Sequence, residues 1–209
     1  MQSSKITLFM ISILLLTPGC VSPKNNQTEN IDSDNTQIEN IDSEDSIPEY
    51  LNLVAQTAGR DIDRGENLDI LGDANGTNTM ILWVSTGCSG CHDWTEFIAN
   101  HMRDGNISND TRIITVHRYP SFETKDEVID VYASENKTTE SLWPVMIPVE
   151  GQPAIDAEKN NETSMTYSEA FENPVTPSLT ILNGEGKTIW KNKTYWANQT
   201  VFDDAMSKL

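Results

Sequence analysis

The residues of this chain best suited to covalent chemistry are Cys88 and Cys91, which are separated by Ser89 and Gly90. A thiolate is the nucleophile of thiol-disulfide exchange, and a helix N-terminus favours that form through its backbone N–H groups and its dipole. Cys91 would lie one turn further into such a helix and would be more buried. This position suits the resolving thiol, which attacks a mixed disulfide formed at Cys88. The spacing therefore predicts a catalytic dithiol that can close into a Cys88–Cys91 disulfide.

The segments on either side of the pair predict the helix that this chemistry needs. Residues 80–85 form a compact apolar run, Met-Ile-Leu-Trp-Val-Ser, which indicates a strand buried on both faces. After the cysteines, Trp94, Ile98 and Met102 fall at helical spacing, and Gly105 is placed to end the helix. The order strand, Cys-x-x-Cys, helix puts the first cysteine at a helix N-terminus.

From about residue 49 the chain alternates between strand and helix patterns. The predicted elements are short strands at 50–56 and 67–71, a buried strand at 112–117, a helix opened by a Thr124–Glu127 capping box, a β-hairpin at 178–182 and 187–191, and a closing amphipathic helix near 201–209. Residues 142–173 are assigned no element and are interpreted as an insertion. Together these patterns predict an α/β domain over residues 49–209.

The third cysteine, Cys20, follows a segment typical of exported proteins. Residues 1–19 contain Lys5, the apolar run 6–16 and Thr17-Pro18-Gly19, which together indicate a signal peptide too short to span a bilayer. A small residue directly before a cysteine is the pattern of lipoprotein signal peptides, so Cys20 is predicted to be lipidated. An ordinary cleaved signal and an uncleaved anchor are the alternatives, and each of them also exports the domain.

Between residues 20 and 48 the composition is polar and acidic. The segment repeats Glu-Asn-Ile-Asp-Ser at 29–33 and 39–43 and cannot form a core. We interpret it as a disordered, self-repelling tether between a lipid anchor in the membrane and the domain. The formal net charge of the whole chain is −18, which disfavours nucleic acid as a partner.

Asn-x-Ser/Thr sequons are spread along the chain in a modest excess over chance placement, which suits a glycoprotein surface. They begin at Asn26, Asn75, Asn106, Asn109, Asn136, Asn161, Asn192 and Asn198. Together with the signal segment, they predict a lipid-anchored protein on the outer side of the cytoplasmic membrane or in the periplasm.

These features resemble the thioredoxin superfamily, and within it the membrane-tethered TlpA-like redoxins, over residues 50–209. The resemblance rests on residues 82–91 (Leu-Trp-Val-Ser-Thr-Gly-Cys-Ser-Gly-Cys), on Trp143-Pro144-Val145 and on Thr176-Pro177 before the hairpin. It implies a thioredoxin-like fold, in which a central mixed β-sheet is flanked by helices and an insertion precedes a cis-proline. It also implies a thiol-disulfide oxidoreductase that needs no cofactor or metal, with protein thiol or disulfide substrates and an upstream redox partner.

By carry-over from the family, Pro177 is the cis-proline facing the dithiol, and the backbone of Thr176 pairs with an extended substrate segment. The chain departs from the family at three positions near the motif. Gly87 stands where the family often has Trp, Gly90 where it often has Pro, and Leu82 where thioredoxin has a buried acid. The resemblance therefore does not identify the residue that handles the proton of the buried thiol.

One alternative belongs to another class of protein. Cys88-Ser89-Gly90-Cys91-His92 also matches the motif by which c-type haem is attached, with both thiols bonded to haem and His92 bound to iron. Because the motif follows a buried strand in an α/β pattern, we favour thiol-disulfide exchange, with His92 as an exposed neighbour whose charge would favour the thiolate. A metal chaperone that uses the same three side chains ranks below haem.

Overall fold

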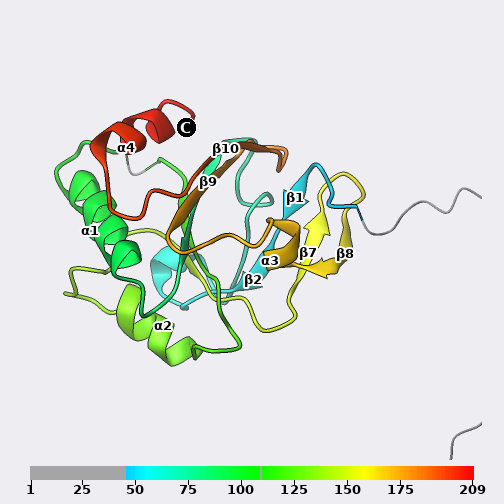
Figure 1. The fold of residues 1–209 in the computed structure, drawn as a ribbon, viewed down its shortest axis with the longest axis horizontal. Coiled ribbons are helices and arrows are strands. Elements are labelled where there is room, and N and C mark those ends of the chain that lie inside the picture. Colours follow the sequence, from blue (N-terminus) through cyan, green and yellow to red (C-terminus); the bar gives the residue numbers. More distant parts are fainter. Residues whose placement is uncertain (1–45, 109) are drawn as a thin grey trace, which may run out of the picture. The chain divides into compact units, whose positions relative to one another are not determined.

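The computed structural model of the protein describes residues 46–108 and 110–209. The predicted signal peptide 1–19, Cys20 and residues 20–45 of the predicted tether lie outside the described residues. The centre of the fold is a five-stranded mixed sheet in the order β10-β9-β4-β5-β6 (Figure 1). Its strands are β4 (Thr79–Val84), β5 (Ile113–His117), β6 (Val145–Met146), β9 (Ser178–Leu182) and β10 (Thr188–Asn192).

Strand β4 lies in the middle of this sheet. It pairs in parallel with β5 and antiparallel with β9, while β6 extends the sheet beyond β5 and β10 extends it beyond β9. All residues of β4 are buried, as expected for an apolar strand that is covered on both faces. The predicted mixed sheet is therefore confirmed, and so is the hairpin that follows Pro177.

Three helices cover one face of the sheet (Figure 1). They are α1 (Ser89–Arg103), α2 (Lys125–Tyr132) and α4 (Gln199–Met206). Their buried residues share one hydrophobic core with Met80, Leu82 and Val84 of β4. Because side chains alternate along a strand, Ile81 and Trp83 belong to a second core on the opposite face.

A side-chain cap fixes the start of each of these helices. Thr124 and Glu127 form the predicted capping box of α2, and Asn198 caps α4. At α1 the cap is Cys88, whose sulfur accepts a hydrogen bond from the amide of Cys91. The start of α1 and the cysteine pair are thus one structural unit.

The other face of the sheet is covered by the N-terminal strands and by residues 142–173, the segment interpreted as an insertion. Tyr167 from this segment stacks on Trp83, with ring centroids 6.2 Å apart. The insertion thus supplies the edge strand β6 and much of the second covering layer. The elements of this layer are β1 (Leu51–Asn52), β2 (Val54–Gln56), β3 (Asn67–Asp69), β7 (Pro153–Asp156), β8 (Asn161–Thr166) and α3 (Tyr167–Ala170). A 3₁₀ turn (Asp61–Asp63) lies next to β6, where Asp63 accepts from the amide of Val145 at 2.9 Å.

Strands β1, β7 and β8 form a small antiparallel sheet, and β2 pairs with β3. None of the helices in the described part of the chain is both long enough and apolar enough to cross a membrane.

Candidate redox site

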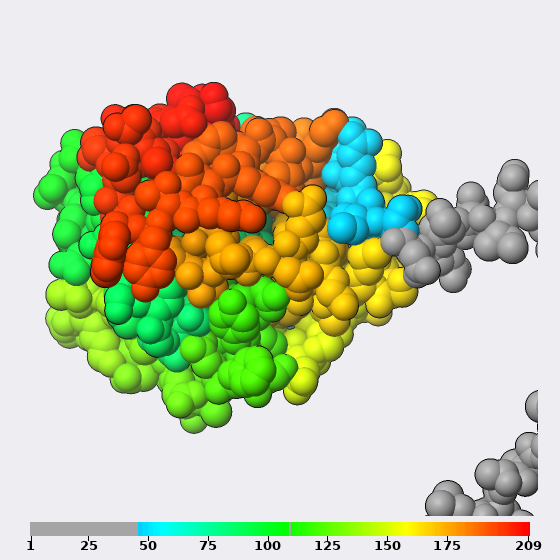
Figure 2. Space-filling view, in the orientation of Figure 1, coloured from blue at the N-terminus to red at the C-terminus, as the bar shows by residue number. Residues whose placement is uncertain are grey.

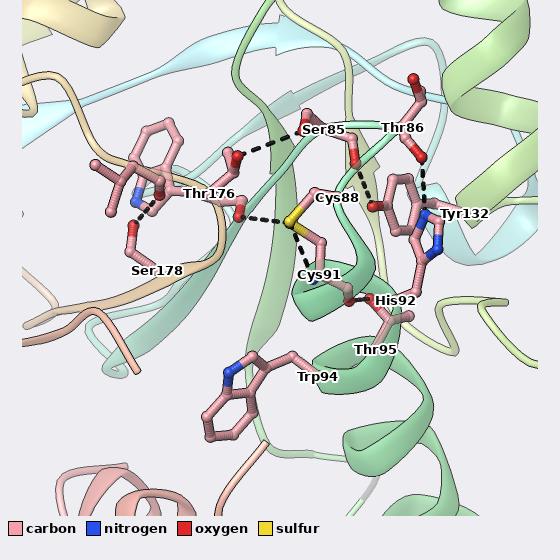
Figure 3. Close-up of a disulfide and its surroundings, with 12 residues drawn as sticks. Ser85, Thr86, Cys88, Cys91, His92, Trp94, Thr95, Tyr132, Thr176 and Ser178 are labelled. Carbon is pink, nitrogen blue, oxygen red and sulfur yellow. Dashed lines mark hydrogen bonds between the residues drawn. A yellow bond between two sulfur atoms is a disulfide. The ribbon is translucent and has the colours of Figure 1, made fainter. Parts of the chain in front are cut away.

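Cys88 and Cys91 form a disulfide where β4 ends and α1 begins (Figure 3). Their Cα atoms are 5.2 Å apart, and the amide of Cys91 lies 3.1 Å from the sulfur of Cys88. Cys88 is 7% exposed, whereas Cys91 is fully buried. Of the two cysteines, Cys88 is therefore the one that a second sulfur can reach from solvent.

The first turn of α1 closes directly around the pair. The carbonyl oxygen of Cys88 accepts hydrogen bonds from the amides of Cys91 and His92 at 2.9 and 3.1 Å. N–H groups at a helix N-terminus stabilise negative charge within the first turn, and a reduced Cys88 lies in that position. The position of Cys88 is thus one where negative charge is stabilised, and Cys91 is its buried partner.

Three side chains from different elements hold Ser85 and Thr86, which connect β4 to the pair. Tyr132 of α2 donates to the carbonyl oxygen of Ser85 at 2.6 Å. Glu123 accepts from the amide of Thr86 at 2.9 Å with each of its carboxylate oxygens. A ring nitrogen of His92 lies 2.8 Å from the carbonyl oxygen of Thr86. The backbone that leads into the disulfide is therefore fixed on both sides of Thr86.

His117 and Glu123 form a polar pair behind this segment. Nε2 of His117, at the end of β5, lies 2.8 Å from Oε2 of Glu123. Burial lowers the pKa of His117 despite the opposing attraction of Glu123. Burial alone would raise the pKa of Glu123, but hydrogen bonds from Thr86 and His117 outweigh it and lower that pKa. At neutral pH the pair is therefore an uncharged imidazole that donates to a carboxylate.

The loop before β9 lies on the opposite side of the dithiol from Tyr132 and His92 (Figure 3). In this loop the Thr176–Pro177 peptide bond is cis. The hydroxyl oxygens of Ser85 and Thr176 are 3.4 Å apart, which brings the loop against the segment that leads into the disulfide. The structure therefore places Thr176 and Pro177 at the same end of β4 as the two cysteines.

The segment between β10 and α4 forms a third wall. Tyr195 lies so close to Gly90 that a Cβ atom on Gly90 would overlap the carbonyl oxygen of Tyr195 and lie 3.0 Å from its ring. Trp94 of α1 donates its ring N–H to the carbonyl of Thr194 at 2.9 Å, and Asp93 accepts from the amide of Ala197 at 2.7 Å. Side chains of α1 thus hold this segment beside the disulfide.

Sequence reasoning placed Cys88, Cys91, Thr176 and Pro177 at the site, and the structure brings these four residues together. Their roles in the reaction stay predictions. The fifth predicted site residue, Cys20, lies outside the described residues.

His92, expected to be exposed, is instead partly buried and bonded to Thr86. Leu82, at the position of the thioredoxin acid, is fully buried in the helix-side core. Sequence reasoning did not identify Glu123 or Tyr132 as part of the site. No local pattern could have shown their roles, because the bonds to Thr86 and Ser85 span 37 and 47 positions of the chain. Within residues 46–108 and 110–209, no group of three or more His, Cys, Asp or Glu side chains is placed to hold a metal ion.

Solved structures similar to this chain have the thioredoxin-like fold. One is a thiol-disulfide oxidoreductase from Bacteroides fragilis, with a TM-score of 0.50 and 10% identity over 76% of this chain and 97% of that one. Another is a candidate thiol:disulfide interchange protein DsbE from Chlorobium tepidum, with a TM-score of 0.51 and 10% identity over 78% and 97% of the two chains. No protein-family model and no curated protein matches the sequence. The protein therefore has a thioredoxin-like fold with an insertion before the cis-proline.

Proposed function

We propose that this protein is an exported thiol-disulfide oxidoreductase that exchanges its Cys88–Cys91 pair, as dithiol or disulfide, with protein substrates. The observation that carries the proposal is the disulfide at the N-terminus of α1, in which Cys88 is 7% exposed and Cys91 is fully buried. Its position in a thioredoxin-like fold and the fixed backbone in front of it give further support. No metal or organic cofactor takes part in the proposed reaction.

The exchange proceeds through a mixed disulfide. A substrate thiolate attacks the sulfur of Cys88, the Cys88–Cys91 bond breaks, and Cys91 leaves as a thiolate. A second substrate thiolate then attacks the substrate sulfur of the mixed disulfide, which forms a substrate disulfide and releases Cys88. Two electrons pass from the substrate to the protein, and the two thiol protons of the substrate end on the two cysteines. The reverse sequence reduces a substrate disulfide, and an upstream redox partner restores the starting form.

Thr176 and Pro177 are proposed to bind the substrate segment that carries the reacting sulfur. Their loop lies against Ser85, in the segment that leads to Cys88, and Thr176 has a backbone carbonyl and an N–H with which an extended chain can pair. This role predicts that a substrate lies across the end of β9 while its sulfur reacts with Cys88.

The N-terminal segments are proposed to place the domain outside the cell. In this proposal residues 1–19 are a lipoprotein signal peptide, Cys20 carries the lipid anchor, residues 20–48 form the tether and residues 49–209 form the domain. A labelled fatty acid should then be incorporated into the wild-type protein and not into Cys20→Ala. Label that persists in Cys20→Ala would overturn the anchor.

Haem attachment has weaker support from the site. It requires His92 as an iron ligand, but a ring nitrogen of His92 lies 2.8 Å from the carbonyl oxygen of Thr86, and the ring packs edge-on against Tyr132. The purified protein should show no Soret absorption, and a Soret band would overturn the exchange proposal.

An exchange assay tests the activity itself. We expect the wild-type protein to accelerate the reduction of insulin disulfides by dithiothreitol or the reactivation of a scrambled disulfide protein. Cys88→Ser should lose that acceleration, whereas Glu96→Gln, an exposed change on the same helix, should keep it. The proposal fails if the wild type accelerates neither reaction, or if Cys88→Ser is as active as the wild type.

A further inference from the structure

Exposed apolar side chains gather around the disulfide. Single exposed hydrophobic residues are normal on a protein surface, but a cluster around a reactive group indicates a binding surface. Four of the large exposed hydrophobic residues belong to segments that border the cysteine pair, and we call them the apolar rim. They are Phe122, Val175, Tyr195 and Trp196, with exposed fractions of 85%, 46%, 46% and 58%.

The segments that carry the residues of the apolar rim contact the residues of the redox site. Phe122 directly precedes Glu123, which binds the amide of Thr86. Val175 directly precedes Thr176, whose hydroxyl lies against Ser85. In Figure 2 the blue-green surface of the redox segment borders the orange-red, orange and green surfaces of the chain near residues 195, 175 and 120. These segments, distant in sequence, thus meet on one face around the pair.

Tyr195 and Trp196 are adjacent aromatic members of the apolar rim, and contacts with each other and with α1 hold them in place. Their rings pack edge to face with centroids 4.9 Å apart, and Tyr195 touches Gly90 between the two cysteines. Trp94 donates to the carbonyl oxygen of Thr194, and Asp93 accepts from the amide of Ala197. These two hydrogen bonds fix both ends of the segment to α1. Aromatic side chains held in this way bind a partner at a low cost in conformational entropy.

The other tryptophans of the chain are used in the core or partly covered. Trp83 and Trp94 are fully buried, Trp143 is 3% exposed, and Trp190 is intermediate. Of these tryptophans only Trp196 is classed as exposed, and its ring packs on Tyr195 rather than into the core. The rest of its surface is covered only when another molecule lies beside the redox pair.

We propose that the apolar rim docks the substrate polypeptide, and that Tyr195 and Trp196 receive an aromatic or aliphatic side chain next to the substrate's reacting cysteine. This inference rests on the proposed exchange function. A mixed disulfide brings the substrate sulfur to about 2 Å from the sulfur of Cys88, so the residues flanking the substrate cysteine must lie over the surrounding side chains. The four rim side chains are apolar or aromatic. A substrate that lies over them buries more apolar surface when the residues beside its cysteine are apolar, as an unfolded protein segment would present them, than when they are charged.

The experiment compares two disulfide-linked peptides, one with Leu and Trp beside the cysteine and one with Ser at those positions. Reduced protein is mixed with an excess of each peptide, the reaction is stopped with acid, and mass spectrometry gives the second-order rate constants. The wild type should reduce the apolar peptide faster than the Ser-flanked peptide. Trp196→Ser, and separately Tyr195→Ser, should lower the ratio of the two rate constants about tenfold, the size expected when a well-packed aromatic contact is lost.

Ile189→Ser is the matched control, because Ile189 is 44% exposed on β10 and lies outside the apolar rim. It should leave the ratio at the wild-type value. The docking surface is overturned if Trp196→Ser and Tyr195→Ser keep the wild-type ratio, or if Ile189→Ser lowers the ratio equally. Hydroxyethyl disulfide, which has no flanking residues, tests the function separately. If the wild type does not reduce hydroxyethyl disulfide, or if Cys88→Ser still reduces it, the proposed exchange function is overturned. If this control behaves as expected, a failed peptide comparison overturns only the docking surface.

Discussion

Both carboxylate oxygens of Glu123 lie 2.9 Å from the amide nitrogen of Thr86, two positions before Cys88. The same carboxylate accepts from the buried ring of His117 at 2.8 Å. Glu123 therefore joins the end of β5 to the backbone that leads into the redox pair. Because hydrogen bonds to a charged acceptor are stronger than neutral ones, this carboxylate is a principal anchor of the segment.

Glu123→Gln should loosen that anchor. The amide side chain keeps one acceptor oxygen but loses the negative charge that receives both Thr86 and His117. We expect the free energy of unfolding of the oxidised protein to fall by about 1–3 kcal/mol, as for other hydrogen bonds to charged groups. Urea denaturation measures the change, with the exposed Glu96→Gln as control. Equal stability of the two variants would show that Glu123 does not hold the segment.

The lowered pKa of His117 predicts a pH dependence of stability. In the unfolded chain, His117 takes up a proton as the pH falls below its ordinary pKa of 6.5. In the folded protein, His117 stays uncharged until the pH falls to its lower folded pKa. The free energy of unfolding should therefore fall as the pH drops through that window, and this contribution is fully present above it. His117→Gln, which does not titrate, should show a flatter dependence between about pH 7.5 and 5.5. Identical slopes in the two proteins would contradict the assignment.

Gly90 and Gly87 offer a matched pair of substitutions. Ala favours a helix over Gly by about 1 kcal/mol, so Gly90→Ala in α1 would stabilise the protein if nothing lay beside it. A Cβ at Gly90, however, would overlap the carbonyl oxygen of Tyr195 and lie 3.0 Å from its ring, whereas a Cβ at Gly87 meets nothing within 4 Å. We expect Gly90→Ala to lower the free energy of unfolding by about 1 kcal/mol or more. Thermal denaturation should show no comparable loss for Gly87→Ala.

Tyr132→Phe tests the second anchor of the segment. The hydroxyl of Tyr132 donates to the carbonyl oxygen of Ser85 at 2.6 Å inside the core, and burial raises the pKa of Tyr132, so the hydroxyl stays protonated at neutral pH. Its removal leaves the Ser85 carbonyl with only the longer bond from the amide of Cys88 at 3.3 Å, which should cost about 1 kcal/mol. Chemical denaturation at neutral pH measures the loss. An unchanged midpoint and slope would mean that another donor replaces the hydroxyl.

The sequence was sufficient to predict the parts of the site that depend on local patterns. The apolar run at residues 80–85 corresponds to β4, which begins and ends one residue earlier. The capping box at Thr124 starts α2 where the pattern placed it. These predictions succeed because strand burial, helix spacing and caps depend on neighbouring residues. The position of Thr176 and Pro177 came instead from the family resemblance.

The rest of the site depends on contacts between distant segments. Residues 142–173 have no readable periodicity, because β6 has only two residues and β7 pairs with β1, about a hundred positions earlier in the chain. For the same reason, nothing near Glu123 indicates that it binds Thr86, and nothing near Tyr195 indicates that it touches Gly90. Such contacts are set by how the elements pack and not by local preference.

The most direct test of exchange at Cys88 is to trap the mixed disulfide. Cys91→Ser removes the thiol that resolves it, so reduced Cys91→Ser protein mixed with a peptide disulfide should accumulate a covalent adduct. Peptide mapping by mass spectrometry should place the peptide on Cys88, and the doubly substituted Cys88→Ser, Cys91→Ser protein should form no adduct. The absence of an adduct on Cys88 in the Cys91→Ser protein would contradict the account.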